Sequence, residues 1–318
     1  MIPRMPPQEA RIGFVHSAPY RIQGVSVAGE QAVVHVPELD VVFDIGLCPR
    51  PALTPSTVAL SHTHMDHVAG LPYWFSQRFF QKMPGNGRCL VHAKMAEPLR
   101  RMMASWVDLE RQKTPHEIVA VEPEQEIELR PNLFLRAIEV SHTIPALAFV
   151  AIERRSKLRD EFHGLSQEKL RELRASGTEI TKTLDIPLVA YTGDTEPGDF
   201  LLRDEFRRAQ VVITECTFFE EEHRDRARIG KHIHVEDLRP LLEAWTAKDV
   251  VIAHVSRRTL MQFARERLEA VAGPARAGSV HLLMDHRANK ARHEAQLAAA
   301  GEPAKPRGDA PGAPVAAE

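Results

Sequence analysis

The sequence predicts an α/β or α+β fold, a layered sandwich in which helices cover β-sheets. Two observations lead to this prediction. The chain opens with several short strands in succession, and its second half alternates short apolar strands with helical segments. Such an order is typical of sheets flanked by helices. With 318 residues, of which 43% are hydrophobic and 26% charged, the chain has the length and composition of a globular protein with a sizeable core.

In the first half, short strands are expected where β-branched residues stand between turn residues. From Ile12 to about Phe43 the valines lie between residues such as Gly24 and Pro37, and Thr57–Leu60 forms a further apolar strand. Two helical stretches and three more strands follow. The helices are expected from about Met65 and over Met95–Leu109, and the strands over 117–121, 126–130 and 133–140.

The middle of the chain, from Glu153 to Thr183, changes character because eight lysines and arginines alternate there with acidic residues. Within it Leu165–Ala175 has helical spacing and is followed by Gly177, a typical helix stop. Beyond it, apolar strands and helices alternate. The expected strands are Ile186–Tyr191, Val211–Thr214, Val250–Ala253 and Val280–Met284, and the expected helices are Val235–Trp245 and Leu260–Val271.

These elements fit one folded domain over residues 1–286, with 153–183 as a candidate short insertion. From about Ala288 the composition turns to Ala, Pro, Gly, Glu and Lys, so residues 287–318 are expected to form a disordered tail. No internal repeat is evident in the sequence.

Charge and cysteine content exclude several classes. A net charge of −2 argues against a protein that coats nucleic acid through its overall charge, although a local basic patch is compatible with it. Three distant cysteines without a C-x-x-C pair argue against a disulfide scaffold and suit a reducing cytosol. Met1–Ala10 lacks the apolar core of a secretory signal, and no apolar run approaches membrane-spanning length. A cytoplasmic protein with no membrane partner is expected.

The strongest motif is His62-Thr-His64-Met-Asp66-His67, directly after an apolar strand. In an extended segment residues i, i+2 and i+4 share one face, so His62, His64 and Asp66 can converge, while His67 can point to a neighbouring position. Imidazole nitrogens and carboxylate oxygens bind Zn²⁺ at about 2.0–2.2 Å, and hydrolytic two-metal sites hold their ions about 3.5–4 Å apart. A polar loop that is His-rich by chance is the competing interpretation, and the spacing favours metal binding.

Two metals need more ligands than this loop supplies. His142, Asp194 and His254 each follow an apolar strand, where α/β architectures place their chemistry. Taken alone, each of these residues is more often a helix cap or a hydrogen-bonded polar residue than a metal ligand. The presence of the histidine cluster makes the metal-ligand interpretation the favoured one. Asp194 can bridge both ions through its two oxygens.

On these residues the chain resembles the metallo-β-lactamase superfamily and, within it, the short-form, plant-type tRNase Z enzymes that process tRNA 3′ ends. The resemblance covers roughly Ile22–Met284. Its motifs are Phe43-Asp-Ile-Gly46, Leu60-Ser-His-Thr-His-Met-Asp-His67, Val140-Ser-His142, Tyr191-Thr-Gly-Asp-Thr195, Thr214-Glu-Cys-Thr-Phe218, Lys231-His-Ile-His234 and His254-Val-Ser256. The first histidine motif specifies only the superfamily, whereas the Glu215 and His232 motifs indicate the RNA-processing branch.

The resemblance implies an αββα four-layer sandwich, two mixed sheets flanked by helices, that usually forms a homodimer. It also implies two ions: His62, His64 and His142 would hold one zinc, and Asp66, His67 and His254 the other, with Asp194 as the bridge. Zinc is the default for this ligand set, and Mn²⁺ or Fe²⁺ can occupy such a site as well.

The implied reaction is phosphodiester hydrolysis by a hydroxide that bridges the two ions, with precursor tRNA or another RNA as substrate. Asp66 would both ligate and accept the proton of the water. His232 would be the general acid, oriented and charged by Glu215, because a carboxylate partner raises an imidazole pKa. Arg258 matches a family arginine and is a candidate phosphate contact. The lysines and arginines at 153–183 make this segment a candidate substrate-gripping insertion, and the acidic residues among them fit a plain solvated helix equally well.

Two other functions stay open at this point. A zinc hydrolase of the same fold can act on a smaller phosphodiester or on an ester, lactone or thioester. A binding protein that keeps the fold without catalysis is the second alternative, and the intact ligand set argues against it. An RNA enzyme should show a basic surface that leads to the metals, and a small-molecule enzyme an enclosed pocket.

Overall fold

The computed structural model describes residues 11–301, which form two seven-stranded sheets. The first sheet contains β1 (Gly13–Ser17), β2 (Tyr20–Val27), β3 (Gln31–Val36), β4 (Val41–Phe43), β5 (Thr57–Ala59), β6 (Arg88–His92) and β7 (Glu117–Val121), in that order. The second contains β8 (Glu126–Arg130), β9 (Leu133–Val140), β10 (Ala146–Leu158), β11 (Thr181–Tyr191), β12 (Val211–Glu215), β13 (Asp249–Ala253) and β14 (Val280–Leu282). The strands expected from the sequence are all present.

Both sheets are mixed, and they share one pairing pattern. Strands β1 to β4 pair antiparallel and β4 to β7 parallel; likewise β8 to β11 pair antiparallel and β11 to β14 parallel. The two halves share the order in which their strands pair but use different residues, so the sequence shows no repeat. The fold is therefore built of two similar halves.

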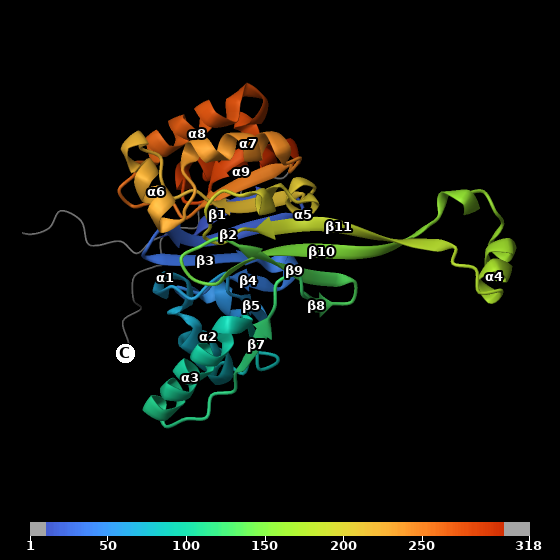
Figure 1. The fold of residues 1–318 in the computed structure, drawn as a ribbon, viewed down its shortest axis with the longest axis horizontal. Coiled ribbons are helices and arrows are strands. Elements are labelled where there is room, and N and C mark those ends of the chain that lie inside the picture. Colours follow the sequence, from blue (N-terminus) through green and yellow to red (C-terminus); the bar gives the residue numbers. More distant parts are fainter. Residues whose placement is uncertain (1–10, 302–318) are drawn as a thin grey trace, which may run out of the picture.

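Helices cover the two outer faces (Figure 1). On the side of the first sheet lie α1 (Met65–Val68), α2 (Leu71–Phe80) and α3 (Ala93–Glu110). On the other side lie α5 (Asp204–Arg207), α6 (Arg224–Gly230), α7 (Leu238–Ala244), α8 (Met261–Arg276) and α9 (His286–Ala299). Among the described residues no helix has both the length and the apolarity that a bilayer crossing requires.

Three apolar cores separate the four layers. Phe43 of β4 and Phe149 of β10 belong to the core between the sheets. Trp74 of α2 packs in the core under the first sheet, and Trp245, which follows α7, in the core above the second. Burying each of these side chains contributes on the order of 1.5–3 kcal/mol. This layering confirms the αββα sandwich that the resemblance implies.

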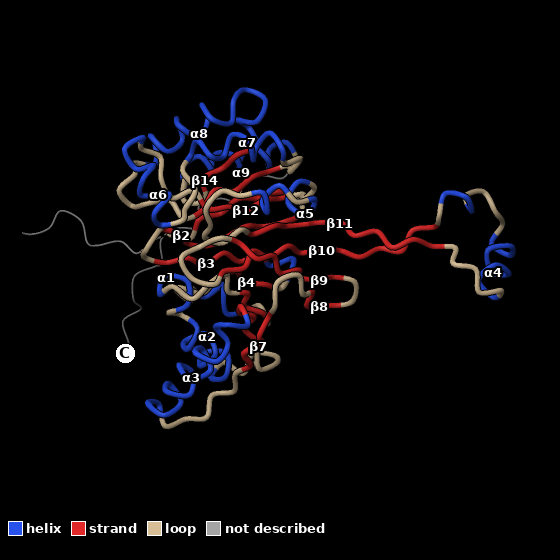
Figure 2. The backbone as a smooth tube through the Cα atoms, in the orientation of Figure 1, coloured by secondary structure: helices blue, strands red, loops and turns tan. Residues whose placement is uncertain are grey.

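A long two-stranded arm projects from this body and carries α4 (Gln167–Ala175) near its tip (Figure 2). Strands β10 and β11 continue their antiparallel pairing outward from Glu153↔Ile186 to Leu158↔Thr181. The expected helix is present, but the strands extend into the cation-rich segment, which the sequence did not predict. Strands that pair away from the body bury neither face, so they lack the alternation of apolar and polar residues by which strands are recognised in a sequence.

Charged residues brace the root of the arm. The Arg154 guanidinium contacts Asp185 at 2.8 Å and Glu126 at 3.0 Å, and Arg136 contacts Glu205 at 2.9 Å. These side chains are between about one eighth and one third exposed, so each pair by itself is worth at most about 1 kcal/mol. As a connected network across β8–β11 they hold the arm in a defined direction.

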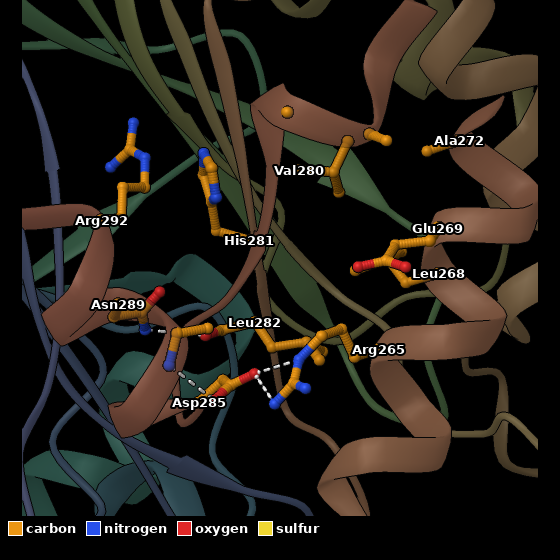
Figure 3. Close-up of a pocket in the computed structure, with 13 residues that line it drawn as sticks. Arg265, Leu268, Glu269, Ala272, Val280, His281, Leu282, Asp285, Asn289 and Arg292 are labelled. Atoms are coloured by element: carbon orange, nitrogen blue, oxygen red, sulfur yellow. Dashed lines mark hydrogen bonds and ion pairs between the residues drawn. The ribbon is translucent and has the colours of Figure 1, made fainter. Parts of the chain in front are cut away.

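The expectation of a disordered tail from residue 287 is wrong for residues 287–301, because α9 occupies most of them. The Asp285 carboxylate accepts from the Ala288 amide and pairs with Arg265 at 2.7 Å, and Asn289 donates to the Leu282 carbonyl (Figure 3). Ala, Lys, Arg and Gln are also good helix formers, so composition alone could not separate a docked helix from a tail.

The same helix is tied to the body on its other side. Arg292 donates to the His16 carbonyl oxygen and to the buried Asp249 carboxylate. Residues 302–318, the rest of the expected tail, and Met1–Ala10 lie outside the described residues.

Candidate metal centre

The predicted ligands converge because they follow the carboxyl ends of strands. The chain enters the centre from several loops. His62, His64, Asp66 and His67 follow β5, His142 follows β9, Asp194 follows β11, Glu215 ends β12, and His254 follows β13. The structure thus brings all seven predicted ligands together from both sheets.

One group consists of three imidazoles. The Nε2 atom of His62 lies 2.9 Å from Nδ1 of His64, which lies 3.2 Å from Nε2 of His142. Nitrogens bound to one tetrahedral ion at about 2.0–2.1 Å would be about 3.3 Å apart, so this spacing fits a shared divalent ion.

Hydrogen bonds on the far side of the rings set the tautomers. Nδ1 of His142 lies 3.1 Å from the Lys231 carbonyl oxygen and must donate its proton there. Nδ1 of His62 lies 3.0 Å from the Ser61 hydroxyl, which itself donates to Asp44. The lone pairs of both Nε2 atoms therefore point to the same position between the three rings, which suits a cation and disfavours a direct hydrogen bond.

A second group joins a carboxylate to two imidazoles. Nε2 of His67 lies 3.4 Å from Nε2 of His254, and the Asp66 Oδ2 atom lies 3.6 Å and 3.4 Å from these two nitrogens. The Gly29 amide donates to the same Asp66 oxygen at 2.9 Å and holds it in place. These three residues are a second group whose ligand atoms are close enough together to hold a metal ion.

Asp194 lies between the two groups. Its Oδ2 atom is 3.3 Å from His67, 3.2 Å from His254 and 3.9 Å from His62. The carboxylate is 3% exposed, and a buried carboxylate among imidazoles requires compensating positive charge. Two divalent ions in the adjacent groups would supply it.

Asp44 anchors the histidine loop from behind. Its carboxylate accepts from Nδ1 of His67 at 2.9 Å, from the Ser61 amide at 2.7 Å and from the Tyr191 hydroxyl at 2.6 Å. At Gly46 an added Cβ would lie 1.6 Å from the Asp66 carbonyl oxygen, so only glycine allows this approach. Both residues therefore shape the loop that carries the histidines.

Glu215 and His232 lie together at the edge of the centre. Nδ1 of His232 lies 2.8 Å from the Glu215 carboxylate, which is 2% exposed. Burial lowers the pKa of His232, but the charge and hydrogen bond of Glu215 outweigh burial and raise this pKa to about 9. The imidazole is therefore protonated at neutral pH, and its side chain keeps 17% exposure toward the groove.

Sequence reasoning missed Thr217, which connects these two parts. Its hydroxyl donates to Glu215 at 2.7 Å and accepts from Nδ1 of His254 at 2.9 Å. Thr217 stands inside the motif Thr214–Phe218, but its link between Glu215 and His254 forms only when the chain after β12 packs beside the chain after β13. His234, in contrast, bonds to the Glu220 carbonyl and caps a short turn, so it does not support His232.

A groove of about 490 Å³ opens over the centre. His64, Asp66, Asp194, His232 and His254 face it, and Arg258 lines its rim as an exposed side chain. The predicted phosphate contact thus lies at the entrance to the metal ligands.

Cys216, next to Glu215, is fully buried, and burial raises the pKa of its thiol well above the usual value, so it is an inert packing residue and no nucleophile. His35 and His92 are buried away from the centre.

Comparisons with known proteins identify the family of the chain. The family model described as "Beta-lactamase superfamily domain" matches residues 46–255. A tRNase Z of Arabidopsis thaliana, TRZ1, is 30% identical over 259 residues, which cover 80% of this chain and 92% of that protein. The nuclear ribonuclease Z of Triticum aestivum is 31% identical over 52% of this chain and 93% of its own length.

Solved structures share the fold. The metallo-beta-lactamase fold protein YhfI from Bacillus subtilis superposes with a TM-score of 0.54 at 16% identity, over 85% of this chain and 95% of its own. The short form of human tRNase Z superposes with a TM-score of 0.53 at 15% identity, over 86% and 96% of the two chains. At these identities the likeness concerns the fold.

Proposed function

The chain belongs to the tRNase Z family of the beta-lactamase superfamily, and from this premise we propose that it is a metal-dependent endoribonuclease that processes the 3′ ends of precursor tRNA. The observation that carries the proposal is the pairing of a complete His/Asp ligand set with a protonated His232 on the same groove. A hydrolase of this kind needs both parts: charge stabilisation at phosphorus and a proton for the leaving oxygen.

The ligand set supports two ions in each chain, with zinc as the preferred metal. His62, His64 and His142 would hold one, and Asp66, His67 and His254 the other, with Asp194 between them. When bound, the ions supply a hydroxide nucleophile at neutral pH and stabilise the charge on the phosphoryl oxygens.

The chain's own residues would handle the protons. Asp66, held by the Gly29 amide, is the candidate acceptor for the proton of the attacking water. His232 donates from the nitrogen that does not face Glu215 to the leaving oxygen, while Glu215 stabilises the imidazolium until the proton is transferred. Thr217 holds that carboxylate in place, so the acid and the ligand His254 keep a common orientation.

Precursor tRNA would be held at two places. Near the groove, Arg258 contacts a phosphate. Away from it, the arm at 153–183 grips the tRNA body, which is consistent with its length and with the absence of any buried residue in α4. Phosphate contacts of this kind position the substrate without reading its sequence.

We expect a cytoplasmic homodimer. Its three cysteines are free, as in a reducing compartment. Ile12, Leu47 and Tyr73, which are 38%, 45% and 54% exposed, line one apolar hollow of about 900 Å³ beside α1 and α2. An exposed apolar patch is typical of a contact surface, and light scattering on the purified chain measures the mass that tests this.

The decisive test is cleavage of a labelled precursor tRNA with a 3′ trailer, beside hydrolysis of bis(p-nitrophenyl) phosphate, with and without chelator. Chelator-sensitive cleavage at the junction of the tRNA and its trailer is the expected result. Activity on the small diester alone would refute the RNA-processing proposal and favour a hydrolase of small phosphodiesters or esters. Metal analysis of the purified protein identifies the ion and its number.

A further inference from the structure

One cation on the groove has no role in the proposed machinery so far. Arg226 of α6 lines the groove together with Asp66 and His232. Its guanidinium carbon lies 5.3 Å from the centre of the Phe218 ring. Phe218 is 8% exposed, and its carbonyl accepts from the Val235 amide, so the ring is a fixed base under the guanidinium.

The neighbouring arginines of α6 are occupied. Arg224 pairs with Glu221 at 2.6 Å and Arg228 with Asp225 at 3.1 Å. Arg226, between them in sequence, makes no ion pair and no side-chain hydrogen bond with any residue of 11–301, although it is exposed.

The loop after β13 shows the same contrast. Arg257 is paired with Glu30, whereas Arg258 forms no ion pair within the described part of the chain. The groove thus presents two uncompensated guanidinium groups, Arg226 and Arg258, from two different segments beside one centre.

The cation–π contact with Phe218 leaves the N–H groups of Arg226 without a side-chain hydrogen bond to any residue of 11–301. A guanidinium that lies on an aromatic ring uses its face, and its N–H edge stays available. That edge matches a phosphate group, which accepts two parallel hydrogen bonds from it. The contact with Phe218 therefore holds the long, flexible Arg226 side chain at the rim of the groove. Arg226 then loses little further conformational entropy when it binds a phosphate.

We propose that Arg226, in cation–π contact with Phe218, binds a phosphate of the substrate strand that neighbours the phosphate being cleaved, with Arg258 contacting the strand from its own loop. The ligand class is a polynucleotide strand with consecutive phosphates. The inference rests on the proposed nuclease function, which it deepens with a substrate-binding residue.

The test compares Arg226→Ala and Arg226→Lys with Arg228→Ala, a matched change of an ion-paired arginine on the same helix. A ten-nucleotide single-stranded RNA is used as an inhibitor of bis(p-nitrophenyl) phosphate hydrolysis, and its Ki is measured between 50 and 300 mM salt. Cleavage of precursor tRNA is measured in parallel, and its kcat/KM is divided by that for the small diester.

Arg226→Ala should raise Ki about fivefold relative to the KM for the small diester and lower the salt slope by about 0.7, the value for one phosphate contact on a single strand. Arg226→Lys should restore the salt slope but not the full affinity, because a lysine keeps the charge and loses the two parallel N–H donors of the guanidinium. Arg228→Ala should stay within twofold of the wild type.

An unchanged Ki for Arg226→Ala, or an equal change for Arg228→Ala, would overturn the inference. So would a decamer that does not inhibit the wild type at all. Failure of the proposed function looks different: the wild type would hydrolyse the small diester and be inhibited by the decamer, yet leave precursor tRNA uncut. The Ki values would then still decide the role of Arg226.

Discussion

Removing the tip of the arm separates substrate gripping from catalysis. Leu158 and Thr181 are paired residues of β10 and β11, so replacing residues 159–180 with Asn-Gly should close the hairpin with a two-residue turn. The deleted part contains α4, none of whose residues is buried, and Ile180 is the one buried residue of 159–180. The side-chain ion pairs of this segment are made with other residues of the arm. The melting temperature should therefore change by at most about 3 °C, which corresponds to roughly 1 kcal/mol.

If net charge alone governed RNA binding, this deletion would strengthen binding, which is the opposite of the expected result. The deletion therefore distinguishes specific contacts from general attraction. Residues 159–180 contain four lysines and arginines and five acidic residues, so their loss makes the protein slightly more positive. A general electrostatic attraction would then strengthen. Arg159 and Lys169 are paired with Glu179 and Glu172, whereas Arg171 and Arg174, three residues apart on α4, make no ion pair among residues 11–301.

The expected loss follows from those two free cations. Each phosphate contact adds about 0.9 to the salt slope of the association constant, so two contacts are worth on the order of thirtyfold at 0.15 M salt. We expect KM for precursor tRNA to rise by about that factor, or about 2 kcal/mol, in steady-state cleavage assays. Hydrolysis of bis(p-nitrophenyl) phosphate should be unaffected, because the small diester does not reach the arm.

Arg171→Ala with Arg174→Ala should reproduce most of the effect, and Lys169→Ala with Glu172→Ala is the matched control that removes an ion pair. A deletion that leaves KM unchanged, or that lowers both activities together, would show that the arm does not grip the substrate.

Three further predictions concern the centre and the fold. His232→Ala should lower kcat by about 10²–10⁴-fold with the metal content of the purified protein unchanged; metal lost in parallel with activity would refute the acid role. Asp194→Ala should leave less than one ion per chain by elemental analysis, and full occupancy would contradict its place between the two groups. Asp249→Ala should lower the unfolding free energy by about 3–5 kcal/mol in denaturant titrations, because His281 and Arg292 lose a buried acceptor. Burial raises the pKa of Asp249, but the bonds from His281 and Ser17 lower it below the usual value. Its stabilisation is therefore fully present above about pH 4 and is lost as the pH falls through the lower folded-state pKa, so the difference between wild type and variant should shrink in acid; a constant difference would refute this.

The ligand positions were predictable because their signals are local. His62, His64, Asp66 and His67 stand within six residues, and this density of ligand types already indicates a metal-binding loop. The extended segment expected to bring His62, His64 and Asp66 onto one face is only partly present, because Asp66 and His67 lie in the short helix α1, and Asp66 approaches His67 and His254 instead. His142, Asp194 and His254 could be added because each follows an apolar strand, and strand ends of packed sheets meet at one edge. The pairing of Glu215 with His232 came only from the resemblance, and the structure places their side chains 2.8 Å apart.

Other features had no local signal. The outward extension of β10 and β11 and the docking of α9 depend on partners that are distant in sequence. For α9, Ala-rich composition fits both a helix and a tail, and the buried Asp249 on another strand decides between them.

By itself, the sequence determined most strands and helices of the body and the residue types of the candidate metal centre, because apolar periodicity and ligand spacing act over a few residues. Only the tertiary structure decided which imidazole nitrogens face the ions, where the proton of His232 is held and which arginines are left free. Those properties arise from hydrogen bonds and ion pairs between segments that meet only after the two sheets have packed.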